Sequence, residues 1–188
     1  FRVGYDGLNY DGNPAFTDLV PQSANIDLGF VSVPMRAFWE EMVSVARTNV
    51  EKIEMLDGIQ IEQELVLELL RGSEAHLQIR DVSVASESFG VQAAGDLFPN
   101  HGGVRPVLGN LSVVTEGVEE LLSHPLVALI SLGYQGQIEQ ILTMARPDGP
   151  VDSDRLRFDF DFGSSGTVLL NDQDLLAALS KVAPPEPE

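Results

Sequence analysis

The chain of 188 residues contains no cysteine and no long hydrophobic run. The absence of cysteine excludes a disulfide scaffold and thiolate metal sites, and it fits a reducing or an oxidising compartment equally well. The longest apolar run, Pro125 to Ile130, is much shorter than the roughly 18 to 20 apolar residues that cross a bilayer. No segment of this sequence is therefore expected to span a membrane.

Basic residues are also scarce. The chain has 11 Lys and Arg against 29 Asp and Glu, which gives a formal net charge of -18. A negative charge of this size repels phosphate backbones and anionic lipid surfaces, so nucleic-acid binding is not expected. The 44% of hydrophobic residues is ample for a core, and the length fits one domain or two closely packed halves.

Two parts of the chain repeat one order of elements. The tetrapeptide Gln60-Ile61-Glu62-Gln63 returns as Gln137-Ile138-Glu139-Gln140, and each copy lies in a helical stretch that precedes an alternating strand, a tight turn and a second strand. This order predicts an internal repeat of two β-α-α-β-β units, residues 24–97 and 108–170.

The same pattern predicts the domain organisation. The first half is expected to comprise residues 1–97, and the second unit residues 107–179, with a boundary in the Gly- and Pro-containing loop 98–106. Residues 180–188, which include three prolines and two glutamates, are expected to form a disordered tail.

Hydrophobic periodicity predicts the fold class α+β, with a largely antiparallel curved sheet and helices packed on one of its faces. The expected strands are residues 1–5, 24–33, 75–85, 89–97, 108–115, 155–162 and 167–170, with a bulge at Arg80-Asp81. The expected helices are residues 35–56, 60–71, 118–123, 125–132, 136–146 and 174–179. The expected core includes Phe38, Trp39, Leu156, Phe158, Phe160 and Phe162.

Residues with catalytic or metal-binding chemistry show no productive spacing. The aspartates within residues 152–161 lack the order of an EF-hand, and on a strand Asp159 and Asp161 share a polar face with Arg155 and Arg157. The segment 163–166, Gly-Ser-Ser-Gly, lacks the spacing of a nucleophile elbow and indicates a turn. No metal-ligand pair is formed by the three histidines, His76, His101 and His124. The sequence thus predicts no catalytic residue, no metal site and no cofactor.

Residues 125–132 are apolar on nearly every side of the expected helix. A fully buried core helix explains this pattern. The alternative is a helix that lies beside a curved sheet and leaves a groove for an acyl chain or a similar apolar group. The predicted lining of this groove is Leu126, Leu129, Ile130, Phe158 and Phe160.

Several short motifs of the second half resemble the C-terminal part of a bacterial envelope family known as domain of unknown function 2125. They are Gly95-Asp96-Leu97-Phe98-Pro99-Asn100, Arg105-Pro106, Gly109-Asn110-Leu111-Ser112-Val113, Gly117-Val118-Glu119-Glu120-Leu121-Leu122, Met144-Ala145-Arg146-Pro147, Asp154-Arg155-Leu156 and the segment 166–173. The resemblance covers residues 75–176, and it extends more loosely to Pro21, Ile26-Asp27-Leu28, Pro34 and Trp39.

This resemblance implies a periplasmic protein with a sheet-and-helix architecture. Members of the family are typically longer and carry an export signal or a membrane anchor, so membrane association is expected only through a segment outside this chain. The family has no established activity and no catalytic residues, and it therefore transfers no site residue.

Three functions compete at this point. The leading hypothesis is a non-enzymatic, exported interaction or scaffold module of the cell envelope that binds a protein partner. The first alternative is the binding or transfer of a lipid or another apolar ligand in the predicted groove, and the second is an enzyme with an unrecognised site. An internal apolar cavity would favour the lipid hypothesis, and a buried polar cluster would favour the enzyme.

Overall fold

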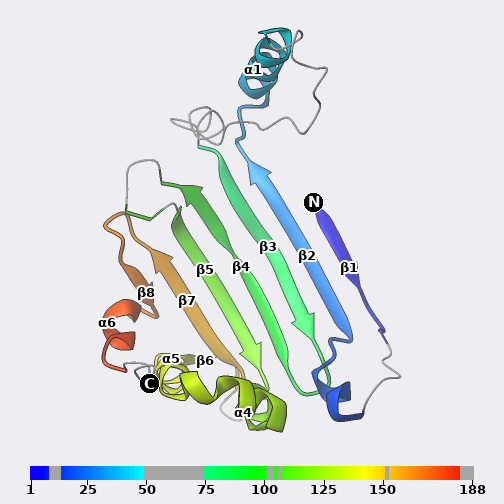
Figure 1. Ribbon diagram of the computed structural model, residues 1–188, viewed down its shortest axis with the longest axis vertical. Helices are drawn as coiled ribbons and strands as arrows, with labels where there is room; N and C mark the ends of the chain where they lie inside the picture. The colour runs from blue at the N-terminus through cyan, green and yellow to red at the C-terminus, as the bar shows by residue number, and fades with distance from the viewer. Residues whose placement is uncertain (9–13, 49–73, 101–103, 106, 151–152, 183–188) are drawn as a thin grey trace.

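The computed structural model describes residues 1–8, 14–48, 74–100, 104–105, 107–150 and 153–182 (Figure 1). They form an α+β structure on a nine-stranded antiparallel sheet, which confirms the predicted fold class. The strands in sheet order are β1 (Arg2–Tyr5), β2 (Ser23–Val31), β3 (His76–Ala85), β4 (Gly90–Pro99), β5 (Val107–Glu116), β7 (Leu156–Phe162), β8 (Val168–Leu170) and β9 (Gln173–Asp174), and β6 (Arg146–Pro147) pairs with β7. The helices are η1 (Pro14–Leu19), α1 (Met35–Thr48), α3 (Val118–Ser123), α4 (Pro125–Ser131), η3 (Leu132–Tyr134), α5 (Gln135–Thr143) and α6 (Leu175–Leu179).

Most predicted elements agree with these bounds to within two residues. Helix α5 ends at Thr143, three residues before its predicted end, because Arg146 and Pro147 pair with β7 as a short strand. Residues 49–56 of the first predicted helix and the whole predicted helix 60–71 lie outside the described residues.

The predicted bulge in β3 is confirmed. Asp27 pairs with Asp81, whereas the next residue, Leu28, pairs with Ile79, so Arg80 is the extra residue. The apolar residues of β3 are odd-numbered before the bulge and even-numbered after it, and one extra residue keeps both sets on the same face of the sheet. Leu77 and Ile79 before the bulge therefore share a face with Val82 and Val84 after it.

The register gives the sheet one apolar and one polar face. A single cross-strand row of the apolar face runs through Ile26, Val82, Ala93, Val113 and Phe158. The neighbouring row, on the opposite face, consists of Asn25, Ser83, Gln92, Val114 and Arg157. Because side chains alternate along each strand, this division holds over most of β1 to β8. At one end of the polar face, however, Val31, Phe98 and Leu108 are apolar.

The buried core lies where α5 and α6 cover the apolar face of β5, β7 and β8. Its buried cluster is Met144, Phe158 and Leu170, and around it pack Val113, Ile141, Leu142, Ala145, Leu156, Phe160, Leu175 and Ala178. Phe158 is 7% exposed, which confirms its predicted burial. The predicted core residues Leu156, Phe160 and Phe162 are half-buried.

The prediction that Trp39 lies in the core is wrong. Its side chain is 67% exposed, because α1 lies beyond the ends of β2 and β3 instead of over the sheet (Figure 1). The side chain of Phe38, the other core residue predicted on this helix, lies outside the described residues.

The two predicted halves share one sheet. The boundary predicted at 98–106 begins within β4, and β4 pairs with β5 from Gly90 with Glu116 to Pro99 with Val107. The orders β2-β3-β4 and β5-β7-β8 correspond, but the two units run in opposite directions with their apolar residues on the same face. Placing β2-β3-β4 on β5-β7-β8 in the same order would therefore put the apolar face of one unit on the polar face of the other. The shared order of elements is the support for the internal repeat, which stays a prediction.

Candidate functional site

The apolar face of β1 to β4 is a contiguous apolar surface, and no described helix lies over it. We call this surface the β1–β4 apolar face; it consists of Val3, Tyr5, Ile26, Leu28, Phe30, Leu77, Ile79, Val82, Val84, Val91, Ala93 and Leu97. None of these side chains is fully buried, and Phe30 is 73% exposed. Contiguous apolar surface of this kind marks an interaction site more often than isolated exposed residues do.

The contrast with the other half of the same face shows the cause of this exposure. Ile26 and Phe158 belong to one cross-strand row, yet Ile26 is exposed and Phe158 is buried. The difference is the cover that α5 and α6 provide over β5, β7 and β8. The sequence alternation is alike in both halves, so it predicts the face but not which part of it is covered.

The structure places the five predicted groove residues at two locations. Leu129 and Ile130 lie on α4 and are exposed, Ile130 to 79%, and Leu126 on the same helix is half-buried. Phe158 lies in the buried cluster with Phe160 packed against it. Residues of α5, not of α4, cover the two phenylalanines, so ligand binding in a groove between α4 and β7 stays a prediction.

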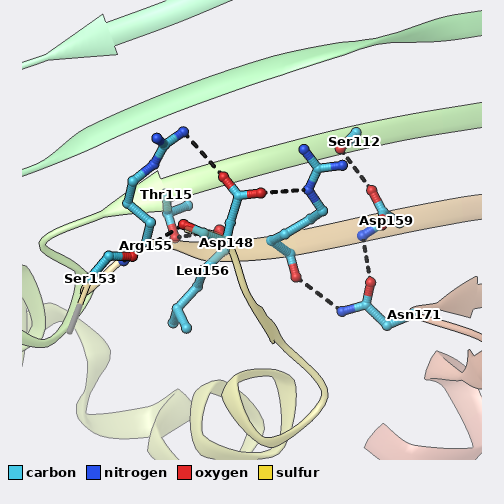
Figure 2. Close-up of polar contacts among 9 residues, drawn as sticks. Ser112, Thr115, Asp148, Ser153, Arg155, Leu156, Asp159 and Asn171 are labelled. Atoms are coloured by element: carbon cyan, nitrogen blue, oxygen red, sulfur yellow. Dashed lines mark hydrogen bonds and ion pairs between the residues drawn. The ribbon is translucent and has the colours of Figure 1, made fainter. Parts of the chain in front are cut away.

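On the polar face, the carboxylate of Asp148 bridges two arginines at the start of β7 (Figure 2). Asp148 Oδ1 accepts a hydrogen bond from Arg157 Nε at 3.0 Å, and its Oδ2 lies 3.2 Å from Nη2 of Arg155. Next to this pair, the Ser112 hydroxyl donates to Asp159 Oδ1 at 2.7 Å. Both arginines remain partly exposed, so these contacts at the start of β7 contribute little to stability.

Among the described residues, Asn171 is the one polar residue that is buried. Its Nδ2 donates to the carbonyl oxygens of Met144 at 2.7 Å and Arg157 at 3.0 Å, and its Oδ1 accepts from the backbone N–H of Asp159 at 2.9 Å. The side chain thereby provides hydrogen-bond partners for backbone groups of β7 that lie between the segments paired with β6 and β8 (Figure 2). These bonds are structural, so this residue does not form the polar cluster that an enzyme hypothesis requires.

Sequence reasoning missed two local roles that have recognisable signals. Asn171 and Asp172 have φ of 49° and 69°, so the Asn-Asp pair forms a two-residue hairpin loop between β8 and β9. His124, for which the sequence predicts no role as a metal ligand, accepts a hydrogen bond from the Leu126 N–H through Nδ1 and caps α4 ahead of Pro125. The ring of His76 packs against the ring of Phe98 at a tilt of 30° across β3 and β4, and His101 lies outside the described residues.

A hollow of about 270 Å³ lies at one end of β3, β4, β5 and β7. By register, Ser83, Gln92, Glu116 and Arg155 of its lining belong to the polar face. Gln92 and Ser83 both donate to Asp81, and Arg155 pairs with Asp148, so these groups are engaged with the protein itself. Within the described ranges no group of three or more histidine or acidic side chains is placed to hold a metal ion.

Comparison with known protein families, with curated proteins and with solved structures gives no match for this chain. The family resemblance of residues 75–176 is therefore carried by the sequence motifs alone. No helix in the described part of the chain combines the length and hydropathy required to span a bilayer.

Proposed function

We propose that this chain is a non-enzymatic interaction module of the cell envelope that holds a protein partner on the β1–β4 apolar face. The observation that supports this proposal is the continuous apolar surface over four paired strands, without a described helix above it. Its outer members Val3, Ile26 and Phe30 are exposed. Covering such side chains contributes about 25 cal/mol for each Å² of apolar surface removed from water.

The open shape of the face favours a protein over a small ligand. Small-molecule sites are concave and enclose most of the ligand surface, whereas a sheet face presents side chains from one side. A helix or a second sheet has an apolar surface that matches it. The net charge of -18 further favours a partner with basic residues around its apolar surface.

Binding of a lipid or another apolar ligand is the second candidate. It is supported by the exposed Leu129 and Ile130 of α4, the helix for which the sequence predicts a ligand groove. The periplasmic location, like the envelope function itself, is part of the proposal and is supported by the resemblance of residues 75–176 to the envelope family.

Photo-crosslinking in cells tests the proposal. A photoreactive residue replaces Ile26 or Val82 on the apolar face, and matched controls replace their polar-face neighbours Asn25 or Ser83. We expect a discrete protein adduct from the apolar-face positions and a much weaker one from the controls. A small mass increase from a lipid would favour the second candidate. Equal labelling from both faces, or none from either, would contradict an interaction at this face.

A further inference from the structure

Helix α1 carries a second exposed apolar surface close to the first. Met35 and Trp39 are four residues apart, so they lie on the same side of the helix, and both are exposed. In the conformation described here, α1 stands beyond the ends of β2 and β3 (Figure 1). One chain thus presents an uncovered sheet face and an uncovered helix side that directly follows one of its strands.

The second half of the sheet shows what covers such a face. The segment between β5 and β7 is helical, and α5 with the adjoining Met144 packs on the apolar face of β5, β7 and β8. The apolar face is continuous across the β4–β5 pair. An amphipathic helix from a segment that connects two paired strands is therefore the kind of element this face accepts.

The connection between β2 and α1 suits the same arrangement. Only Ser32, Val33 and Pro34 separate the strand from the helix, and connections of about 2 to 6 residues commonly return a helix onto its own sheet. The 14 residues of α1 make a helix about 21 Å long, shorter than the roughly 30 Å of the nine-residue β2. Ser32 has a φ of 54°, in the left-handed region, so a return to an ordinary φ at this residue would redirect the helix.

We infer that α1 folds back onto the β1–β4 apolar face as its intramolecular occupant, and that the described conformation, with α1 beyond β2 and β3, is the open state to which a partner binds. The short connection gives α1 a high effective concentration at its own sheet. Two copies of a chain with a net charge of -18 repel each other, which disfavours binding of α1 from a second copy. A partner that binds this face then displaces α1. The inference concerns the same face as the proposed function, but the isolated chain is sufficient to test it.

Trp39 is the only tryptophan of the chain, so its fluorescence reports on α1 directly. In the purified wild-type protein we expect emission at a shorter wavelength than that of free N-acetyltryptophanamide, and weaker quenching by iodide. Ile26→Asp on the apolar face should return both values to those of the free compound. Ser23→Asp, on the polar face of the same strand, should leave them unchanged. Water-exposed emission in wild type, with a sheet-like circular dichroism spectrum in all three proteins, would overturn the inference.

Crosslinking provides a second measurement that does not introduce a charge. The chain has no cysteine, so Trp39→Cys combined with Ile79→Cys gives one pair for a short bifunctional maleimide. The matched control combines Trp39→Cys with Gln78→Cys, the adjacent residue on the opposite face. We expect an intrachain product at least several-fold more abundant for the Ile79 pair. Equal yields from both pairs would overturn the inference, and interchain products would assign the face to a second copy. Photo-crosslinking to an external partner can succeed or fail independently of either result.

Discussion

At the residue scale, the structure assigns its most constrained polar position to Asn171. The side chain is buried and makes three hydrogen bonds to backbone groups of β7 and of Met144, while its own backbone takes the left-handed conformation of a hairpin loop. Asparagine meets both demands, because it tolerates positive φ and has both a donor and an acceptor. The side chain of Asn171 therefore serves the structure: it supplies hydrogen bonds that backbone groups at the edge of β7 would otherwise lack.

Replacing Asn171 with Ala is expected to reduce the free energy of unfolding by at least about 3 kcal/mol, from three hydrogen bonds at about 1 kcal/mol each. Urea denaturation measures the loss. Asn171→Gly removes the same bonds but accepts the φ of 49°, so it should be about 1 kcal/mol less destabilising than the alanine variant. A loss below about 1 kcal/mol for Asn171→Ala would show that water or neighbouring groups replace these bonds.

At the element scale, β7 shows how one alternating strand serves two environments. Leu156, Phe158 and Phe160 pack with residues of α5 and α6. On the polar face, Arg157 pairs with Asp148 and Asp159 accepts a hydrogen bond from Ser112. Burial varies along the apolar side as well, because the helices cover Phe158 more completely than Phe160. A helix that crosses a strand covers only part of the strand's length, so side chains near the ends of the strand remain partly exposed.

Phe158→Ala is expected to cost about 3 to 5 kcal/mol of stability, as for a fully buried phenylalanine. Phe160→Ala should cost clearly less, since its side chain is half-buried, although the residue is of the same type two positions away. Thermal or urea unfolding of both variants checks this order. The reverse order, or a loss below about 1 kcal/mol for Phe158→Ala, would contradict the described cover of β7.

At the scale of the whole molecule, the pairing of β4 with β5 makes the two halves one structure. The ladder extends along both ten-residue strands, so neither half has a sheet edge of its own at this position. The apolar face crosses the same pair and is covered on one side of it only. The two halves thus share backbone hydrogen bonds, while they differ in how their apolar surface is buried.

A substitution at Gly109 tests whether the two halves unfold together, because this residue lies in β5 opposite Leu97 of β4. Its φ is +124°, and an added Cβ would overlap the carbonyl oxygen of Asp96. Gly109→Ala is therefore expected to cost at least about 3 kcal/mol and to lower amide protection in both β4 and β5. Hydrogen exchange measures the second effect. Loss of protection in β5 alone would show that the halves unfold independently.

The sequence by itself determined the α+β class, the antiparallel strands, the bulge at Arg80 and the apolar side of β7, because these follow from local alternation and from turn residues. Only the tertiary structure decided where the helices lie. Trp39 and Phe158 both occupy apolar positions of amphipathic elements, yet the first is exposed and the second is buried. Periodicity shows which side of an element is apolar, but the cover over that side depends on contacts between residues distant in the chain. The same reason explains why the sequence predicted a groove beside α4, whereas the described open surface lies on β1 to β4, which α1 leaves uncovered.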